Sequence, residues 1–296
     1  MIKKIIIARH HGFCMGVKRA IRIAEETAQN ETGRVTILKE IVHNDAVVDK
    51  FRQAGVRQSY TVDEVECGTL IISAHGVAPV IKRMAKEKGL QVVDATCSLV
   101  RRIYEIIDKI KKDYYIIHFG DPSHDETEGI VGHAPDRITV VATLEEMFAL
   151  PEWKDRRLAM TVQTTANLDD FTEIEKTARV KWPHIKIFNT ICNATHQRQE
   201  AIVQLAPTVD MVLVVGSATS ANSKRLVNIS RPLCKRAMLI NSEKDIEETW
   251  FADGQVEKVG LTAGASTPDF LVKAVIKHLV DISGGKAEVL YQNDSD

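Results

Sequence analysis

Short apolar runs rich in β-branched residues alternate with longer stretches of helical periodicity along almost the whole chain. A short, continuously apolar run indicates a strand that is buried on both faces. Strands of this kind, separated by helices, are typical of α/β proteins with mainly parallel sheets. The predicted strands are 5–10, 35–41, 69–75, 91–96, 114–120, 138–142, 158–164, 185–190, 211–217, 237–241 and 258–264. The intervening helical stretches include 17–30, 98–113, 168–182, 196–206 and 267–282.

The composition argues against several classes of protein. Lys and Arg number 39 against 40 Asp and Glu, so a net charge of -1 gives no broad drive toward nucleic acid or an anionic membrane. The opening MIKKIIIARHH is too short for a signal-peptide core, and no window approaches the roughly 18 apolar residues of a membrane span. We therefore expect a cytoplasmic globular protein that binds neither nucleic acid nor membrane.

Three of the five cysteines lie in similar places, each shortly after a predicted strand and just before a helical pattern. They are Cys14, Cys97 and Cys192. The repetition predicts three similar α/β domains, each contributing one thiol. The expected domains are 1–96, 97–191 and 192–282, followed by a C-terminal tail at 283–296.

A position near a helix start favours the thiolate form of these three cysteines, because unpaired N–H groups and the helix dipole stabilise negative charge. Three thiolates from separate strand ends suit a metal centre with an open fourth position. The alternative is that they are structural or redox thiols, since an isolated cysteine is commonly a small buried hydrophobe. We expect that ordinary role for Cys67 and Cys234.

Polar residues at other strand ends form a set suited to an anion, because ligands of α/β sheets bind beyond the carboxyl ends of the strands. Neutral donors and helix N-termini can hold a diphosphate without a P-loop, and no GxxxxGK[ST] motif occurs. Each histidine alone is more simply a structural residue. The candidate binding residues are His43, His75, His124, Ser220, Asn222 and Ser266.

Glu126 and Thr164 are candidates for proton chemistry. A carboxyl near an anionic ligand holds its proton more readily, so Glu126 could act as a general acid. Thr164 ends another apolar run, where its hydroxyl could orient that carboxyl. The simpler alternatives are a solvated loop carboxylate and a strand-to-helix cap.

Nine motifs occur in the order found in LytB-type reductases, and the chain resembles that family from about residue 10 to about residue 270. The motifs are GFCMGVKRAI, EIVHN, SAHGV, DATC, HDETEGIVGH, QTT, ICNATHQRQEA, GSATSANS and LTAGAST. The resemblance implies three α/β domains about a pseudo-threefold axis. It also implies a 4Fe-4S cluster, held in a central cavity by Cys14, Cys97 and Cys192.

The resemblance further implies a reaction of isoprenoid synthesis by the non-mevalonate pathway. This is the reductive dehydroxylation of 4-hydroxy-3-methylbut-2-enyl diphosphate to isopentenyl and dimethylallyl diphosphate. Glu126 would supply a proton, with Thr164 organising the network and His124 assisting. Thr164 and the six candidate donors would bind the substrate. Because no GxGxxG fingerprint follows a strand, a ferredoxin or flavodoxin is the expected electron donor.

Two positions depart from the family pattern. Ala221 stands where the family often has a second serine, and Asp125 where it often has proline. One lost hydrogen bond to a charged group costs about 1.5 to 3 kcal/mol, so affinity could change while the chemistry survives. Two rival functions are a metal or redox sensor and a phosphate-binding protein with structural thiols. Neither requires an acid together with a full set of diphosphate donors.

Overall fold

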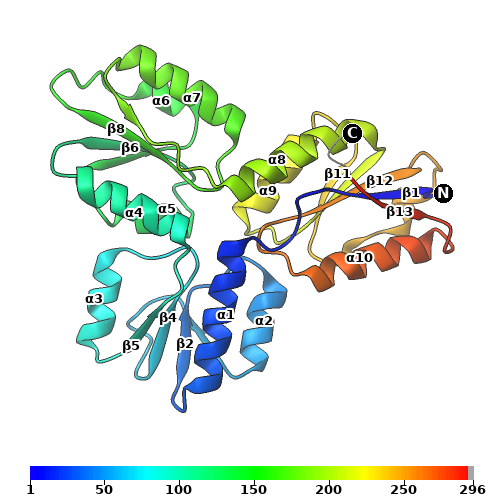
Figure 1. Cartoon of the computed structure of the whole chain (residues 1–296), viewed down its shortest axis with the longest axis horizontal. Coiled ribbons are helices and arrows are strands. Elements are labelled where there is room, and N and C mark those ends of the chain that lie inside the picture. The colour runs from blue at the N-terminus through cyan, green and yellow to red at the C-terminus, as the bar shows by residue number, and fades with distance from the viewer. Residues whose placement is uncertain (293–296) are drawn as a thin grey trace. The chain divides into compact units, whose positions relative to one another are not determined.

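The computed structural model describes residues 1–292, and their strands form three parallel sheets (Figure 1). The spatial order of sheet A is β11 (Ala237–Ile240), β10 (Met211–Val215), β12 (Lys258–Ala263), β1 (Lys4–Ile7) and β13 (Glu288–Tyr291). That of sheet B is β3 (Arg57–Ser59), β2 (Val35–Leu38), β4 (Thr69–Ile72) and β5 (Gln91–Asp94). That of sheet C is β7 (Ile138–Val141), β6 (Tyr115–Phe119), β8 (Leu158–Val162) and β9 (Lys186–Ile187). The predicted α/β class with three parallel-sheet domains is confirmed.

The helices follow the strands as the apolar periodicity predicts. Residues 1–292 contain the helices α1 (Met15–Asn30), α2 (Asp45–Gln53), α3 (Pro79–Glu87), α4 (Ser98–Ile110), α5 (Asp125–Val131), α6 (Leu144–Ala149), α7 (Leu168–Lys181), α8 (Asn193–Leu205), α9 (Ala221–Ser230) and α10 (Asp269–Ile282). Every predicted strand and helical stretch coincides with an observed element. Strands β3 and β13 are additional.

The three sheets share one strand order. In sheets B and C, the first strand lies between the second and the third, and the fourth lies outside the third. Sheet A repeats this order with β10, β11 and β12, but β1 occupies the fourth position. Figure 1 shows β1, in dark blue, within the sheet formed by C-terminal strands. The N-terminal segment therefore supplies the fourth strand of the repeated strand order in sheet A.

The domain boundaries differ from the sequence-based prediction at both ends of the chain. The prediction assigns 1–96 to one domain, yet β1 pairs with β12 and β13. It treats 283–296 as a tail, yet Glu288–Tyr291 forms a strand; residues 293–296 lie outside the described residues. Strand pairing is non-local, so the pattern of β1 alone could not reveal its partners.

The chain divides into two compact units, and unit 1 combines segments that are far apart in the sequence. Unit 1 contains Met1–Cys14, His43–Asp45 and the chain from Asn193 onward, and so carries sheet A. Unit 2 contains Met15–Val42 and Ala46–Cys192, and carries sheets B and C.

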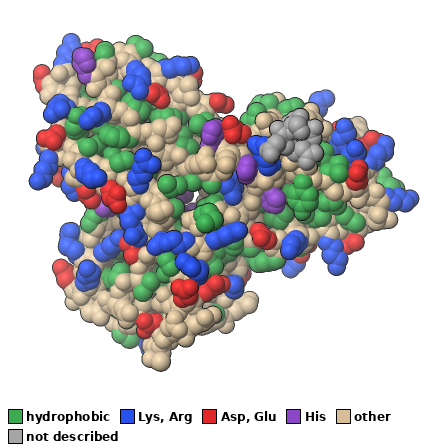
Figure 2. Space-filling model, in the orientation of Figure 1, with side chains coloured by type: hydrophobic (Ala, Val, Ile, Leu, Met, Phe, Trp, Pro, Cys, Tyr) green, Lys and Arg blue, Asp and Glu red, His purple; other side chains and the backbone are tan. Residues whose placement is uncertain are grey.

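The strands lie in the apolar cores of these units. Strands β8 and β10 are buried at every residue, as expected for parallel strands covered on both faces. Basic and acidic side chains are interspersed over the face shown in Figure 2, in keeping with the net charge of -1. Within residues 1–292, no helix has the length and apolarity needed to cross a membrane.

Candidate functional site

One local framework holds each of the three predicted cysteine ligands. Cys14, Cys97 and Cys192 follow the fourth strand of their sheets and directly precede α1, α4 and α8. The N–H of each donates a hydrogen bond to the carbonyl two residues past the end of the third strand. The acceptors are Ala265 for Cys14 at 3.1 Å, Ala74 for Cys97 at 2.9 Å and Thr164 for Cys192 at 2.9 Å.

The setting of these cysteines fits the chemistry of a metal ligand. All three are partly exposed, and each directly precedes a helix. Thiolates are the protein ligands of iron-sulfur clusters. By contrast, Cys67 is exposed, and Cys234 is buried with its Sγ 3.5 Å from the Arg236 carbonyl oxygen.

Glu126 is held by Thr164 in unit 2. The Thr164 N–H donates to one Glu126 carboxyl oxygen at 2.7 Å, and the Thr164 hydroxyl donates to the other at 2.6 Å. Only 2% of Glu126 is exposed, and this burial raises its pKa although both hydrogen bonds from Thr164 act in the opposite direction. The side chain is therefore suited to hold a proton, as a general acid must.

His124 is fixed by the start of α5. As the N-cap residue, it accepts a hydrogen bond from the Glu126 N–H through Nδ1, at 3.1 Å. In a neutral imidazole this leaves the proton on Nε2, which can donate to a ligand. The ring of His75 packs edge-on against that of His124, with centroids 5.5 Å apart.

Unit 1 gathers small polar donors at the start of α9. Ser220 is its N-cap and accepts from the Ser223 N–H. The Ser266 hydroxyl donates to the His43 carbonyl at 2.9 Å and lies 3.4 Å from the Ser220 hydroxyl. Asn222 is 4% exposed, and neither atom of its side-chain amide has a hydrogen-bond partner among the described residues. A buried amide of this kind fits a site that an external ligand completes.

The predicted residues therefore fall into two groups, one in each unit. Unit 2 holds Glu126, Thr164, His124 and His75 with two of the cysteines; the acceptor for Cys97 is next to His75 in sequence. Unit 1 holds the serines, Asn222 and His43 with Cys14, whose acceptor is next to Ser266.

Sequence reasoning missed Lys39 and Tyr104. The Lys39 ammonium binds Asp125 at 2.8 Å and also binds Glu128. The Tyr104 hydroxyl donates to the His75 carbonyl at 3.3 Å, and its ring stacks on His133. The spacing of Asp125 and Glu128 on one helix face was the available signal for a nearby cation.

Comparisons with known proteins agree with this arrangement. The family described as LytB protein matches residues 5–280. The 4-hydroxy-3-methylbut-2-enyl diphosphate reductase of Aquifex aeolicus is 36% identical over 286 residues, covering 95% of this chain and 98% of the relative. The protein of the same name from Wolbachia pipientis wMel is 41% identical over 284 residues, covering 93% and 91%.

A solved structure is also similar to the whole chain. The E-1-hydroxy-2-methyl-but-2-enyl-4-diphosphate reductase from Plasmodium falciparum has a TM-score of 0.92 at 31% identity, covering 100% of this chain and 94% of that one. The resemblance predicted from the nine motifs is therefore confirmed.

Proposed function

This chain belongs to the LytB family, and we propose that it catalyses the reductive dehydroxylation of 4-hydroxy-3-methylbut-2-enyl diphosphate. The products are isopentenyl diphosphate and dimethylallyl diphosphate, which places the chain in the non-mevalonate pathway of isoprenoid synthesis. The reaction takes up two electrons and two protons. One proton leaves with the hydroxyl group as water, and the other is added to the carbon skeleton.

The observation that carries this proposal is the framework repeated at Cys14, Cys97 and Cys192. We infer that these cysteines are the protein ligands of a 4Fe-4S cluster. When bound, such a cluster supplies the electrons, and an iron without a protein ligand offers a Lewis acid to the substrate hydroxyl. The pseudo-threefold axis and central cavity implied by the family stay predictions.

We assign binding of the substrate diphosphate to Ser220, Asn222 and Ser266 together with three histidines. The unmatched amide of Asn222 supports this assignment, because a buried donor without a partner costs about 1 to 3 kcal/mol unless a ligand satisfies it. Ser220 and Ser266 lie beside it at the N-terminus of α9, where the helix dipole favours an anion. We assign His43, His75 and His124 to the same ligand.

We assign proton delivery to Glu126. The two hydrogen bonds from Thr164 fix both carboxyl oxygens, so the carboxyl does not have to reorganise before it transfers a proton to the leaving hydroxyl. The Nε2–H of His124 is a second donor in the same unit. Thr164 acts by holding the acid and also contacts the substrate in this proposal.

The electrons require a separate donor protein, and we propose a ferredoxin or a flavodoxin. We also propose a cytoplasmic location, because thiolate ligands persist in a reducing compartment.

The test measures iron, acid-labile sulfide and visible absorbance of anaerobically purified protein. We expect about four irons per chain, the content of one 4Fe-4S cluster. The content should fall sharply in Cys14→Ser, Cys97→Ser and Cys192→Ser. It should persist in the matched control Cys67→Ser, since that thiol is exposed and lies outside the framework.

Two outcomes would contradict the proposal. Stoichiometric zinc would indicate a structural or sensory metal site. Protein that takes up no iron after anaerobic reconstitution would indicate a phosphate-binding protein with structural thiols.

A further inference from the structure

We propose that Lys39 is a positioning residue that neutralises Asp125 beside the diphosphate site, so that this carboxylate can lie near His75 and His124 without repelling the substrate. The inference rests on the proposed function, because it concerns the residues that we assign to the diphosphate. It concerns the ion pair between Lys39 and Asp125, which lies outside the residues assigned to catalysis and to substrate binding.

Three charged side chains meet where β2 ends and α5 begins. The Lys39 ammonium is 2.8 Å from one Asp125 carboxyl oxygen and also binds Glu128, one helical turn further along α5. The side chains of Lys39 and Asp125 are 23% and 19% exposed. Water therefore screens this pair less than it screens a surface pair.

The backbone conformation and a backbone hydrogen bond fix the position of Lys39. Its φ is +60°, a left-handed conformation that costs a lysine about 1 kcal/mol or more. Its N–H donates to the Ser59 carbonyl at 2.7 Å, which fixes this turn to the neighbouring strand β3. Strained backbone at a fixed place is more common at functional sites than on an ordinary surface.

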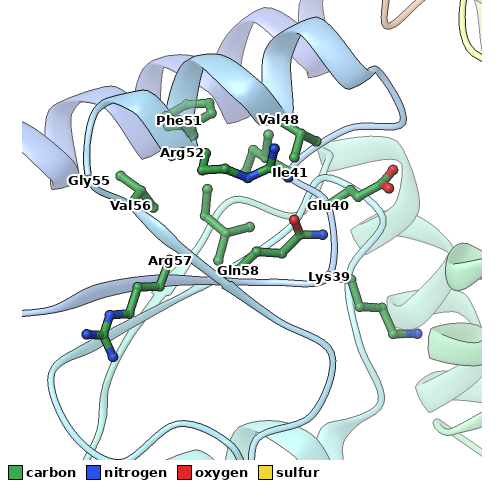
Figure 3. A pocket seen from close by; sticks show the side chains of 11 residues that line it. Lys39, Glu40, Ile41, Val48, Phe51, Arg52, Gly55, Val56, Arg57 and Gln58 are labelled. Carbon is green, nitrogen blue, oxygen red and sulfur yellow. The ribbon is translucent and has the colours of Figure 1, made fainter.

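The direction of the side chain favours a role toward α5. Lys39 lies at the rim of a hollow of about 350 Å³ beside α2. Figure 3 shows its side chain extending away from Phe51 and Arg57, which line the same hollow. Its ammonium therefore binds the carboxylates of Asp125 and Glu128 in α5 and does not enter the hollow.

Asp125 is close to the proposed substrate ligands on both sides. Its second carboxyl oxygen is 3.9 Å from Nδ1 of His75, and its chain neighbours are His124 and Glu126. A negative charge at this point repels a diphosphate, and the repulsion is strong where water is scarce. A bound ammonium cancels the repulsion.

Lys39 retains its charge in this setting. Burial alone would disfavour the ammonium, but the hydrogen bonds that it donates to Asp125 and Glu128 outweigh this effect and raise the pKa of Lys39 above its usual value. The cation is therefore present throughout the neutral range.

The test compares the wild type with a single and a double variant as anaerobically purified holoenzymes, with inorganic pyrophosphate as the calorimetric probe. We expect Lys39→Ala to weaken binding by about tenfold, because the cation bound to Asp125 is removed. Lys39→Ala/Asp125→Asn should bind within about threefold of the wild type, because the repelling charge is also gone. The matched control is Lys50→Ala, which breaks an exposed ion pair with Glu25 and should leave the affinity unchanged.

Three other outcomes would each contradict the proposed role of Lys39. Wild-type affinity in Lys39→Ala would overturn the role of Lys39. A double variant as weak as Lys39→Ala would mean that Lys39 itself contacts the phosphate, which also overturns it. A wild type that does not bind pyrophosphate would overturn the diphosphate site, and with it the inference.

Discussion

Glu126 and Asn222 are both buried polar side chains, but they differ in how their hydrogen-bonding capacity is used. Both Glu126 oxygens accept from Thr164, whereas the amide of Asn222 has no partner among the described residues. The first is held in one geometry, and the second has hydrogen-bonding capacity that the described residues do not use. Sequence motifs identified both residues. They did not identify Lys39, because its partner Asp125 is 86 positions away and only the fold brings them together.

The raised pKa of Glu126 predicts a pH-dependent stability difference. Its folded pKa lies above the unfolded value, so its contribution to stability is complete below the unfolded pKa and is lost as the pH rises through the folded pKa. Glu126→Gln keeps a hydrogen-bonding side chain that cannot ionise. We therefore expect the Tm of Glu126→Gln, relative to the wild type, to increase between about pH 5 and pH 8. Turnover should fall by about 100- to 10,000-fold.

The control for this titration is Glu64→Gln. The Ser59 hydroxyl and the Tyr60 N–H bind Glu64 and lower its pKa, so it is ionised over the whole interval. Its Tm difference from the wild type should stay constant. A constant difference for Glu126→Gln as well would show that Glu126 does not retain its proton in the folded state.

At the level of elements, apolar periodicity identified the buried strands because they lie in a core on both faces. It missed β3, whose residues Arg57–Ser59 are polar, and β13, which is mostly exposed. It also could not reveal how α4 and α5 approach each other. Close to the site they meet at Tyr104, whose hydroxyl occupies the space that Cβ atoms at Gly76 and Gly129 would fill.

Gly129→Ala is predicted to disturb the helix that carries Glu126. An added Cβ would lie 2.4 Å from the Tyr104 hydroxyl oxygen, so either the buried Tyr104 side chain or the packing of α4 against α5 must shift. We expect a net loss of about 1 to 3 kcal/mol in unfolding free energy. This loss remains after the roughly 1 kcal/mol by which alanine stabilises a helix relative to glycine. Urea unfolding of the reconstituted holoenzyme measures this change.

Tyr104→Phe provides the internal control, because it removes the oxygen that clashes. The double variant Tyr104→Phe/Gly129→Ala should be more stable than the sum of the single effects predicts. Gly33→Ala, whose added Cβ has no heavy atom within 4 Å, should cause little change. Additive effects would mean that Tyr104 does not set this spacing.

At the level of the whole molecule, the first and last described strands are neighbours in sheet A. Strand β1 lies between β12 and β13, and Gln292 completes the edge by accepting from the Arg9 N–H and donating to the Ala201 carbonyl, both at 3.2 Å. The sequence predicted the strand in β1 but placed it in a first domain of residues 1–96, whereas it pairs with β12 and β13. Its short apolar pattern contains nothing that distinguishes a neighbour at residue 35 from one at residue 258.

A chain shortened to end at Gly285 is predicted to loosen unit 1. Strand β1 loses one of its two partners and becomes an edge strand. We expect hydrogen exchange of the β1 amides to accelerate by at least about tenfold, while the amides of β6 and β8 in unit 2 keep their rates. A chain ending at Gln292 retains β13 and is the control. Unchanged exchange in β1 would show that β13 adds nothing to its stability.

The position of β1 also determines when sheet A can form during synthesis of the chain. Sheets B and C consist of residues 35–187 in one continuous stretch, so they can form while the ribosome is still translating. Cys14 is made well before Ala265, whose carbonyl accepts the hydrogen bond from the Cys14 N–H. The position of Cys14 in sheet A is therefore not fixed until Ala265 has been made, so the proposed 4Fe-4S cluster would be delivered to all three cysteines only after that point.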